Sequence, residues 1–221
     1  MHLPLRLRTI GDLISSGEKV ADIGADHGIL ELYLVGKIPD IQIVAIENKE
    51  GPYENLKQTL SGLKGVRLSL SDGLTSVDKK VTTIVLAGMG GLNIKKILDE
   101  APQKLQHIDK IIIDAHRDKD IARKTIVNYG FKIEKEIIVF EENKFYIISE
   151  FVKTKKVPHY SKDVLEIGYK LYKDDLWQSY KKHLINNNKN LIGRIKNEPN
   201  TQDKVLKLLK MIERIGKYGK H

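Results

Sequence analysis

Glycines and acidic residues gather at four places in this 221-residue chain, and each cluster follows a short run of β-branched apolar residues. The clusters are Asp22-Ile23-Gly24-Ala25-Asp26-His27-Gly28, Glu47-Asn48, Ser71-Asp72-Gly73 and Ala87-Gly88-Met89-Gly90-Gly91. Such runs are typical of strands, and the carboxyl ends of parallel strands form the edge at which α/β sheets bind ligands. We therefore expect the four clusters to form one ligand site.

The first cluster carries acidic side chains where a nucleotide phosphate would need bare backbone. Its glycines, Gly24 and Gly28, are four residues apart, so the dinucleotide pattern G-x-G-x-x-G is absent and a dehydrogenase is disfavoured. Asp26, which lies between them, would repel a pyrophosphate at a helix N-terminus. The turn suits a cationic ligand instead, such as S-adenosylmethionine, which has a sulfonium and a positive amino group.

The other three clusters supply groups for the rest of an adenosyl cofactor. Glu47 follows Asp22 by 25 residues, and a carboxylate there can accept both ribose hydroxyls. Asp72 can accept the exocyclic amine of adenine, and the third group of glycines allows close backbone approach beside the methyl group. Each cluster alone could simply cap a helix, but four on successive strands indicate an adenosyl cofactor. The predicted cofactor residues are Asp22, Gly24, Ala25, Asp26, His27, Gly28, Glu47, Asn48, Asp72, Gly73, Ala87, Gly88, Met89 and Gly90, and no metal site is expected.

The elements that must position these residues alternate between strand and helix patterns. Strands are predicted at 19–23, 41–46, 66–70, 82–86 and 110–113, each followed by a turn and a segment with helical spacing, and two more at 131–140 and 144–152. Only Glu141-Glu142-Asn143 separates the last two, so the final strand should run antiparallel. A helix over 3–16 precedes the first strand. This is the α/β layout of a Rossmann-like class I methyltransferase sheet, mostly parallel with an antiparallel last strand.

The charge and the pattern both change near residue 155. Residues 1–154 contain 22 Lys and Arg against 22 Asp and Glu, whereas residues 155–221 contain 16 against 7 and so hold the whole net charge of +9. The second segment has helical spacing, a weak point at Asn186-Asn187-Asn188 and a break at Pro199-Asn200. We predict a catalytic domain at 1–154 and a basic, all-α helical hairpin, similar to a coiled coil, at 155–221. The excess points equally to a polyanion partner or to a solvated lysine-rich face.

Composition excludes several classes of protein. The chain has no cysteine, which excludes disulfide scaffolds, thiolate nucleophiles and cysteine-based zinc sites. Its hydrophobic fraction of 41% is too high for a disordered chain. It has no apolar run long enough to cross a bilayer and no signal-peptide pattern, so we expect a cytoplasmic protein.

Five segments together form a distinctive combination: Leu5-Arg6-Leu7, Val20-Ala21-Asp22-Ile23-Gly24-Ala25-Asp26-His27, Glu50-Gly51-Pro52, Ser71-Asp72-Gly73-Leu74 and Ala87-Gly88-Met89-Gly90-Gly91. The combination resembles the bacterial tRNA (adenine-22-N1)-methyltransferase family. The resemblance covers about 1–150 by motif and the rest by architecture. It implies methyl transfer from S-adenosylmethionine to N1 of an adenine in the D-arm region of tRNA, with the clusters above beside the cofactor and the target base.

The chain departs from this family at three places. Asp114-Ala115-His116 stands where the family usually has Gln-Pro-Asn, so any grip of that tripeptide on the target base must differ here. Glu47 replaces the usual Asp and keeps the carboxylate, and Gly28-Ile29 replaces Ala-Tyr, which removes an aromatic contact.

Catalysis at N1 would require alignment more than proton removal, because neutral adenine has a free lone pair there. The methylated ring is cationic until its exocyclic amine loses a proton, and a carboxylate would stabilise that charge. Asp26 is the first catalytic candidate, followed by Asp114 and His116. His27 could contact RNA phosphate, orient Asp26 or hydrogen-bond within its turn.

N1 lies on the Watson–Crick edge, so the target base must be unpaired or flipped out, and contacts to the RNA backbone must offset that cost. The predicted RNA-binding residues are Arg6, Arg8, His27, Lys170, Lys173, Lys181, Lys182, Arg194 and Lys196. Tyr169, Tyr172, Trp177 and Tyr180 lie among them, and packing within the hairpin is favoured over stacking on bases. We expect a monomer. The alternatives are methylation of another RNA or of a protein, and a non-catalytic RNA-binding module.

Overall fold

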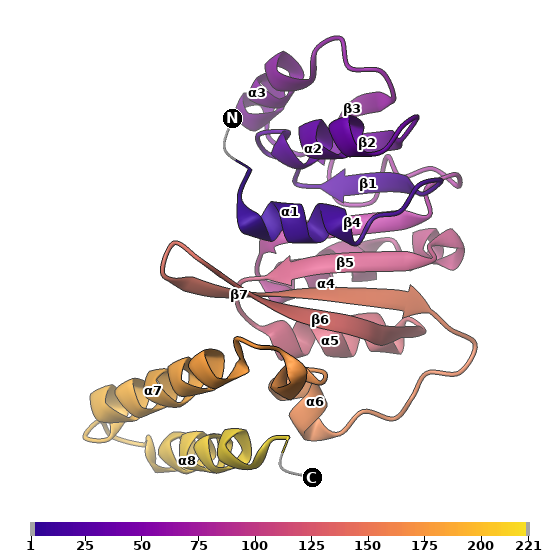
Figure 1. The fold of residues 1–221 in the computed structure, drawn as a ribbon. Coiled ribbons are helices and arrows are strands. Elements are labelled where there is room, and N and C mark those ends of the chain that lie inside the picture. Colours follow the sequence, from indigo (N-terminus) through magenta and orange to yellow (C-terminus); the bar gives the residue numbers. More distant parts are fainter. Residues whose placement is uncertain (1–2, 220–221) are drawn as a thin grey trace. The chain divides into compact units, whose positions relative to one another are not determined.

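A computed structural model describes residues 3–219. The chain divides into two compact units, 1–159 and 160–221, five residues beyond the boundary placed on the sequence. The first unit is built on a seven-stranded sheet, and the second contains helices (Figure 1). Among the described residues, no helix is both long and apolar enough to span a membrane.

The sheet has the strand order β3-β2-β1-β4-β5-β7-β6. Its strands are β1 (Lys19–Ile23), β2 (Gln42–Glu47), β3 (Val66–Leu70), β4 (Thr83–Met89), β5 (Lys110–Ala115), β6 (Phe131–Glu141) and β7 (Lys144–Lys153). The five strands β1 to β5 pair in parallel, and β7 pairs antiparallel with both β5 and β6. The predicted Rossmann-like sheet with an antiparallel last strand is therefore confirmed.

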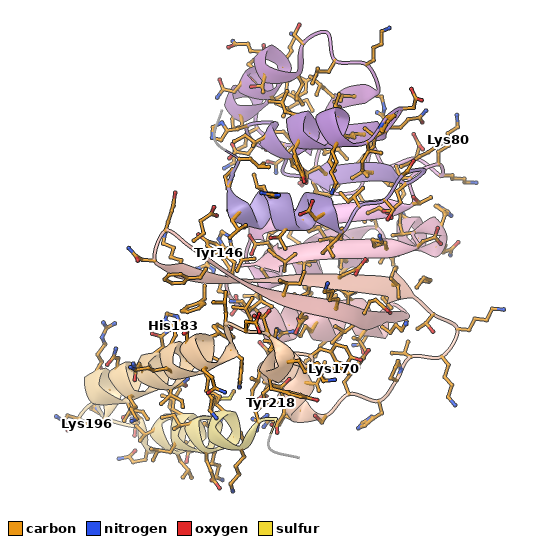
Figure 2. All side chains as sticks on the ribbon, viewed as in Figure 1. Lys80, Tyr146, Lys170, His183, Lys196 and Tyr218 are labelled. Atoms are coloured by element: carbon orange, nitrogen blue, oxygen red, sulfur yellow. The ribbon has the colours of Figure 1, made fainter. Side chains whose placement is uncertain are left out.

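The connection between β3 and β4 is the one place where the predicted strand–helix alternation is wrong. Residues 71–82 contain turns and no helix. Leu74, Val77 and Val81 are buried. The ammonium of Lys104 donates to the carbonyls of Thr75 and Val77 at 3.2 and 2.6 Å. These two carbonyl groups therefore have hydrogen-bond partners although the loop forms no helix. The loop ends near Lys80, which Figure 2 labels.

Five helices cover the two faces of this sheet. They are α1 (Leu5–Asp12), α2 (Ile29–Lys37), α3 (Glu50–Leu60), α4 (Gly91–Glu100) and α5 (Lys119–Asn128), with a short 3₁₀ helix, η1 (Pro102–His107). The helix α1 is shorter at both ends than predicted. Figure 1 shows α1 and α2 in front of the sheet, with α4 and α5 behind it.

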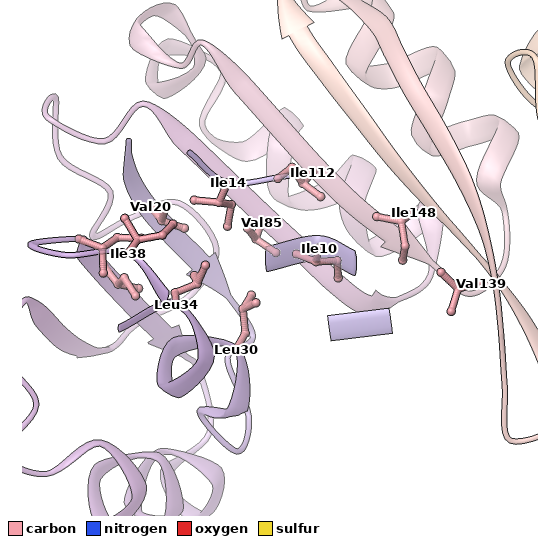
Figure 3. Packing of buried hydrophobic residues seen from close by; sticks show 12 residues of the cluster. Ile10, Ile14, Val20, Leu30, Leu34, Ile38, Val85, Ile112, Val139 and Ile148 are labelled. Carbon is pink, nitrogen blue, oxygen red and sulfur yellow. The ribbon is translucent and has the colours of Figure 1, made fainter. Parts of the chain in front are cut away.

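The core beneath α1 and α2 explains why these helices lie where they do. Ile10 from α1, Ile14 just after it, and Leu30 and Leu34 from α2 pack on strand residues such as Val20 (Figure 3). Because side chains alternate along a strand, Asp22, two positions after Val20 on β1, faces the same side of the sheet as Val20. The face under α1 and α2 therefore also receives functional residues at the strand ends.

The second unit contains α6 (Lys162–Glu166), η2 (Leu171–Lys173), α7 (Trp177–Ile195) and α8 (Gln202–Lys217). The predicted pair of long helices is confirmed as α7 and α8, but Asn186–Asn188 does not weaken α7. The helix runs without interruption through these residues, and the side chain of Asn188 donates to the Leu184 carbonyl at 2.8 Å, one turn earlier. Arg214 on α8 pairs with Asp163 and Glu166, which ties α8 to α6.

Candidate cofactor and methyl-acceptor site

The turn between β1 and α2 is held in an unusual backbone conformation. Gly24, Asp26 and Gly28 have φ angles of 79°, 50° and 72°. The amides of Gly24 and Ala25 both donate to the Ile46 carbonyl, at 2.8 and 3.1 Å, which fixes the turn against β2. Left-handed backbone at a residue other than glycine costs free energy, and such residues cluster at functional sites.

Two cavities open on either side of Gly24. The smaller, of about 130 Å³, is lined by residues that include Asn48, Asp72 and Met89. The larger, of about 250 Å³, is lined by Arg6, Asp22, Asp26, His27, Ala87, Gly88 and His116 among others. A ligand with a nucleoside end and a cationic amino-acid end fits this pair of neighbouring cavities, because the larger cavity carries the acidic turn.

The carboxylates at the ends of β2 and β3 are anchored through one amide residue. Glu47 is buried, and its Oε1 accepts hydrogen bonds from the backbone amides of Asn48 and Lys49 at 3.0 and 3.1 Å. The Asn48 side chain donates to Asp72 Oδ1 at 3.2 Å. These hydrogen bonds hold Glu47 and Asp72 at the ends of two neighbouring strands.

Gly73 and Met89 complete this smaller cavity. Gly73 is buried with a φ angle of 52°, so the chain turns sharply directly after Asp72. The Asn93 side chain donates to Met89 Sδ at 3.6 Å. Gly88, with a φ of 74°, lines the larger cavity at the end of β4, whereas Gly90 lines neither cavity and lies against the Arg117 side chain.

Asp22 lines the larger cavity and lies on the face of the sheet that α2 covers. It pairs in register with Ala45 and Val85, two positions after Val20. Burial raises the pKa of Asp22 to about 7, although a hydrogen bond from Glu31 lowers it. Glu31, which is fully buried in the first turn of α2, has a pKa well above its usual value, first through burial and then through the charge of Asp22.

Asp26 and His27 lie at the mouth of the same cavity. His27 Nε2 is 3.5 Å from Asp26 Oδ2, and the two side chains are 66% and 63% exposed. A carboxylate in this position is accessible to a second substrate as well as to a cofactor.

Asp114 occupies a different position from Asp26. It pairs in register with Ala87 and Ile148 and is fully buried. Its Oδ2 lies 3.5 Å from Arg6 Nη1 and 3.3 Å from His116 Nε2, and Oδ1 has no hydrogen-bond partner among the described residues. His116 and Arg6 line the cavity, so Asp114 can act by orienting these two side chains.

Glu31 and Tyr146 are site residues that the sequence motifs did not reveal. Tyr146, on β7 (Figure 2), contacts the His116 ring edge-on with centroids 5.4 Å apart, and Arg6 lies 5.8 Å from the Tyr146 ring centroid. No motif marks it. A signal for Glu31 was available, because it is a charged residue between Leu30 and Leu34 on the apolar face of α2.

The predicted RNA-binding residues divide into exposed and engaged side chains. Arg6 is half-buried against Asp114, whereas Arg8 is 63% exposed. In the second unit Lys173, Lys182, Arg194 and Lys196 are exposed, and Figure 2 labels Lys196 beyond the end of α7. Lys170 is also exposed, but its ammonium lies 4.6 Å from the Tyr169 ring centroid. Lys181 instead donates to the Gly216 carbonyl at 2.9 Å and so links α7 to α8.

The aromatic residues of the second unit pack mainly on one another. Trp177 and Tyr180 are buried, and Trp177 meets Tyr218 with ring centroids 5.2 Å apart. Tyr172 is 39% exposed but also contacts Tyr218, and Tyr169 contacts Tyr160. These contacts agree with packing within the helical unit.

The known proteins that resemble this chain are consistent with this geometry. A family described as a methyltransferase domain matches residues 3–149. The chain belongs to this family. The predicted methyltransferase fold, and S-adenosylmethionine as the cofactor of that fold, are thereby confirmed.

Individual relatives of this methyltransferase bear the name of the family that the motifs resemble. The tRNA (adenine(22)-N(1))-methyltransferase of Bacillus subtilis is 30% identical over 150 residues, which cover 66% of this chain and 63% of that protein, less than two thirds of its length. A Streptococcus pneumoniae protein solved with S-adenosyl-L-methionine is 26% identical, with a TM-score of 0.86 over 98% of this chain and 99% of that one. TrmK of M. capricolum, solved with S-adenosyl-homocysteine, is 29% identical, with a TM-score of 0.82 over 98% of both chains.

Proposed function

We propose that this methyltransferase transfers a methyl group from S-adenosylmethionine to N1 of adenine 22 in tRNA. The observation that carries the proposal is the linked set of Glu47, Asn48 and Asp72 beside the acidic turn of Asp22 and Asp26, all at one edge of the sheet. The proposed acceptor atom is the one in the name of the Bacillus subtilis relative, which is similar to this chain over 150 residues.

The residues at this edge divide the work of holding the cofactor. Glu47 would accept hydrogen bonds from the ribose hydroxyls, and Asp72 would accept one from the exocyclic amine of adenine. Gly24, Ala25, His27 and Gly28 form the turn around which the ligand would bend, with Asp22 facing its amino group. When bound, S-adenosylmethionine supplies a methyl group on a positively charged sulfur. Ala87, Gly88, Met89 and Gly90 would flank that group.

The acceptor side is proposed to lie in the larger cavity, beside Asp26 and His116. The N1 lone pair needs no base before it attacks, so the chain must align the ring and exclude water. Asp26, at the mouth of the cavity, would stabilise the cationic ring and receive the proton from its amine. Asp114 would act through His116, which it fixes from below by a contact of 3.3 Å.

Binding of tRNA is assigned mainly to the second unit, residues 160–221. It holds 14 Lys and Arg against 7 Asp and Glu, and α7 has no acidic residue. The exposed side chains of Lys170, Lys173, Lys182, Arg194 and Lys196 would contact phosphates and offset the cost of flipping the base. A monomer would suffice, because one chain carries both the cofactor side and the acceptor side of the site. A protein that acts on tRNA is expected in the cytoplasm.

The test is incubation of the full chain with unmodified tRNA and methyl-labelled S-adenosylmethionine, followed by mapping of the labelled nucleotide. We expect label at N1 of adenine 22, and none in a tRNA in which guanine replaces that adenine. Equal labelling of both tRNAs, or labelling of a protein instead, would overturn the proposed acceptor. Failure of the chain to bind S-adenosylmethionine in calorimetry would overturn the enzyme itself.

A further inference from the structure

The α2 residue Glu31 is buried in a way that the fold does not require. Its side chain is fully inaccessible, and neither of its carboxyl oxygens accepts a hydrogen bond from an N–H or hydroxyl donor among the described residues. Leu30 and Leu34 on the same helix are packed in the apolar core. A buried charge without a partner costs several kcal/mol, so an apolar residue here would stabilise the fold.

The group that faces Glu31 is the carboxyl of Asp22. Strand alternation places Asp22 under α2, and the charge of Asp22 acts on Glu31. The surrounding side chains on this face are apolar, namely Val20 from β1, Ala45 from β2 and Val85 from β4. As two ionised carboxylates the pair would contain only acceptors and would repel. A single proton supplies the missing donor.

We propose that Glu31 is a positioning residue that keeps this proton and donates it in a hydrogen bond to Asp22, so that Asp22 presents an ionised carboxylate to the amino group of S-adenosylmethionine. The inference rests on the proposed cofactor site. Asp22 lines the larger cavity, whereas Glu31 does not, so Glu31 can act only through Asp22.

The shifts in pKa agree with this direction of donation. The hydrogen bond between the two groups lowers the pKa of Asp22 and raises that of Glu31, which is the pattern expected when Glu31 is the donor. The raised pKa of Glu31 favours its protonated form, while Asp22, with a pKa of about 7, ionises near neutral pH. A bound cation beside Asp22 would favour its ionised form.

Two variants separate the donor from its bulk. Glu31→Gln keeps a neutral donor of the same shape, and Glu31→Met fills the same space with no donor. Calorimetric titration of the full chain with S-adenosylmethionine should give wild-type affinity, within about twofold, for Glu31→Gln. It should give about tenfold weaker binding for Glu31→Met, the effect of one lost hydrogen bond to a charged group.

Two further measurements exclude a merely structural role. The melting temperature of Glu31→Met should equal or exceed that of the wild type, because an apolar side chain in this buried place avoids the cost of desolvating a carboxyl. Methylthioadenosine lacks the amino-acid end of the cofactor, so it should bind all three proteins equally.

Each contrary result has a distinct meaning. Equal binding of S-adenosylmethionine by the wild type and Glu31→Met, or equal weakening by both variants, would overturn the donor role. Parallel loss of methylthioadenosine binding would assign Glu31 to packing and also overturn it. Absence of S-adenosylmethionine binding by the wild type would overturn the proposed function, and this inference with it.

Discussion

The two units of this chain use charged side chains in different ways. The first unit has 24 Lys and Arg against 22 Asp and Glu, and many are paired, as Lys110 is with Glu18 and Glu150. The second unit has twice as many basic as acidic residues, and its helix α7 has only basic ones. Asp22 and Asp26 of the first unit line the larger cavity, whereas basic side chains of α7 such as Lys182 and Arg194 are exposed on the surface of the second unit. Chemistry and RNA attraction should therefore be separable by mutation.

The largest expected effect is on chemistry alone. Asp26→Ala should lower the rate of methyl transfer at least a hundredfold, because it removes the carboxylate placed at the cationic ring. Affinity for tRNA, measured by filter binding, should stay within about twofold. Asp40→Ala is the matched control, since Asp40 is also exposed and has a similar φ of 58° but lies before the amino end of β2 and lines neither cavity. A wild-type rate for Asp26→Ala would remove Asp26 from the mechanism.

The converse experiment targets RNA attraction alone. Reversing Lys182, Arg194 and Lys196 to Glu should weaken tRNA binding about a hundredfold and flatten its dependence on salt, because phosphate contacts are lost. Calorimetric affinity for S-adenosylmethionine should not change.

A matched reversal of Lys64, Lys79 and Lys80, which are exposed in the first unit, changes the net charge equally. If it weakened tRNA binding as much, net charge and not the second unit would account for the attraction.

A third effect belongs to the buried acids of the first unit and concerns stability. The pKa of Glu31 is raised in the folded state, so between its ordinary value of 4.5 and that raised value the folded chain keeps a proton that the unfolded chain has released. Wild-type stability must then fall as pH rises. Glu31→Gln removes this titration, so its stability relative to the wild type should grow as the pH rises above 4.5, by at most about 1.4 kcal/mol per pH unit, measured by urea unfolding. A difference independent of pH would show that Glu31 is ionised when folded.

Most of the first unit could be predicted from its sequence, because its signals are local. Runs such as Lys110–Ile113 and the three-residue turn at 141–143 predict strands and a hairpin, and the glycine clusters mark the binding edge. The loop at 71–82 could not be predicted, since two of its carbonyls, those of Thr75 and Val77, accept from Lys104, a distant residue. The pairing of Glu31 with Asp22 likewise depends on how α2 lies on the sheet. In the second unit, Asn188 bonds within its helix, where composition alone suggested a break.

The smallest effect distinguishes two adjacent lysines of α7. Lys182 is exposed, so Lys182→Ala should weaken tRNA binding about threefold. The slope of log affinity against log salt concentration should fall by about one, the value for one lost phosphate contact. Lys181 is half-buried and donates to the Gly216 carbonyl at 2.9 Å, so Lys181→Ala should lower the melting temperature and leave the salt slope unchanged. Equal salt slopes in the two variants would mean that exposure does not select the lysines that contact RNA. The distinction between lysines bonded within the protein and exposed lysines would then fail in the second unit, where most of the basic excess lies.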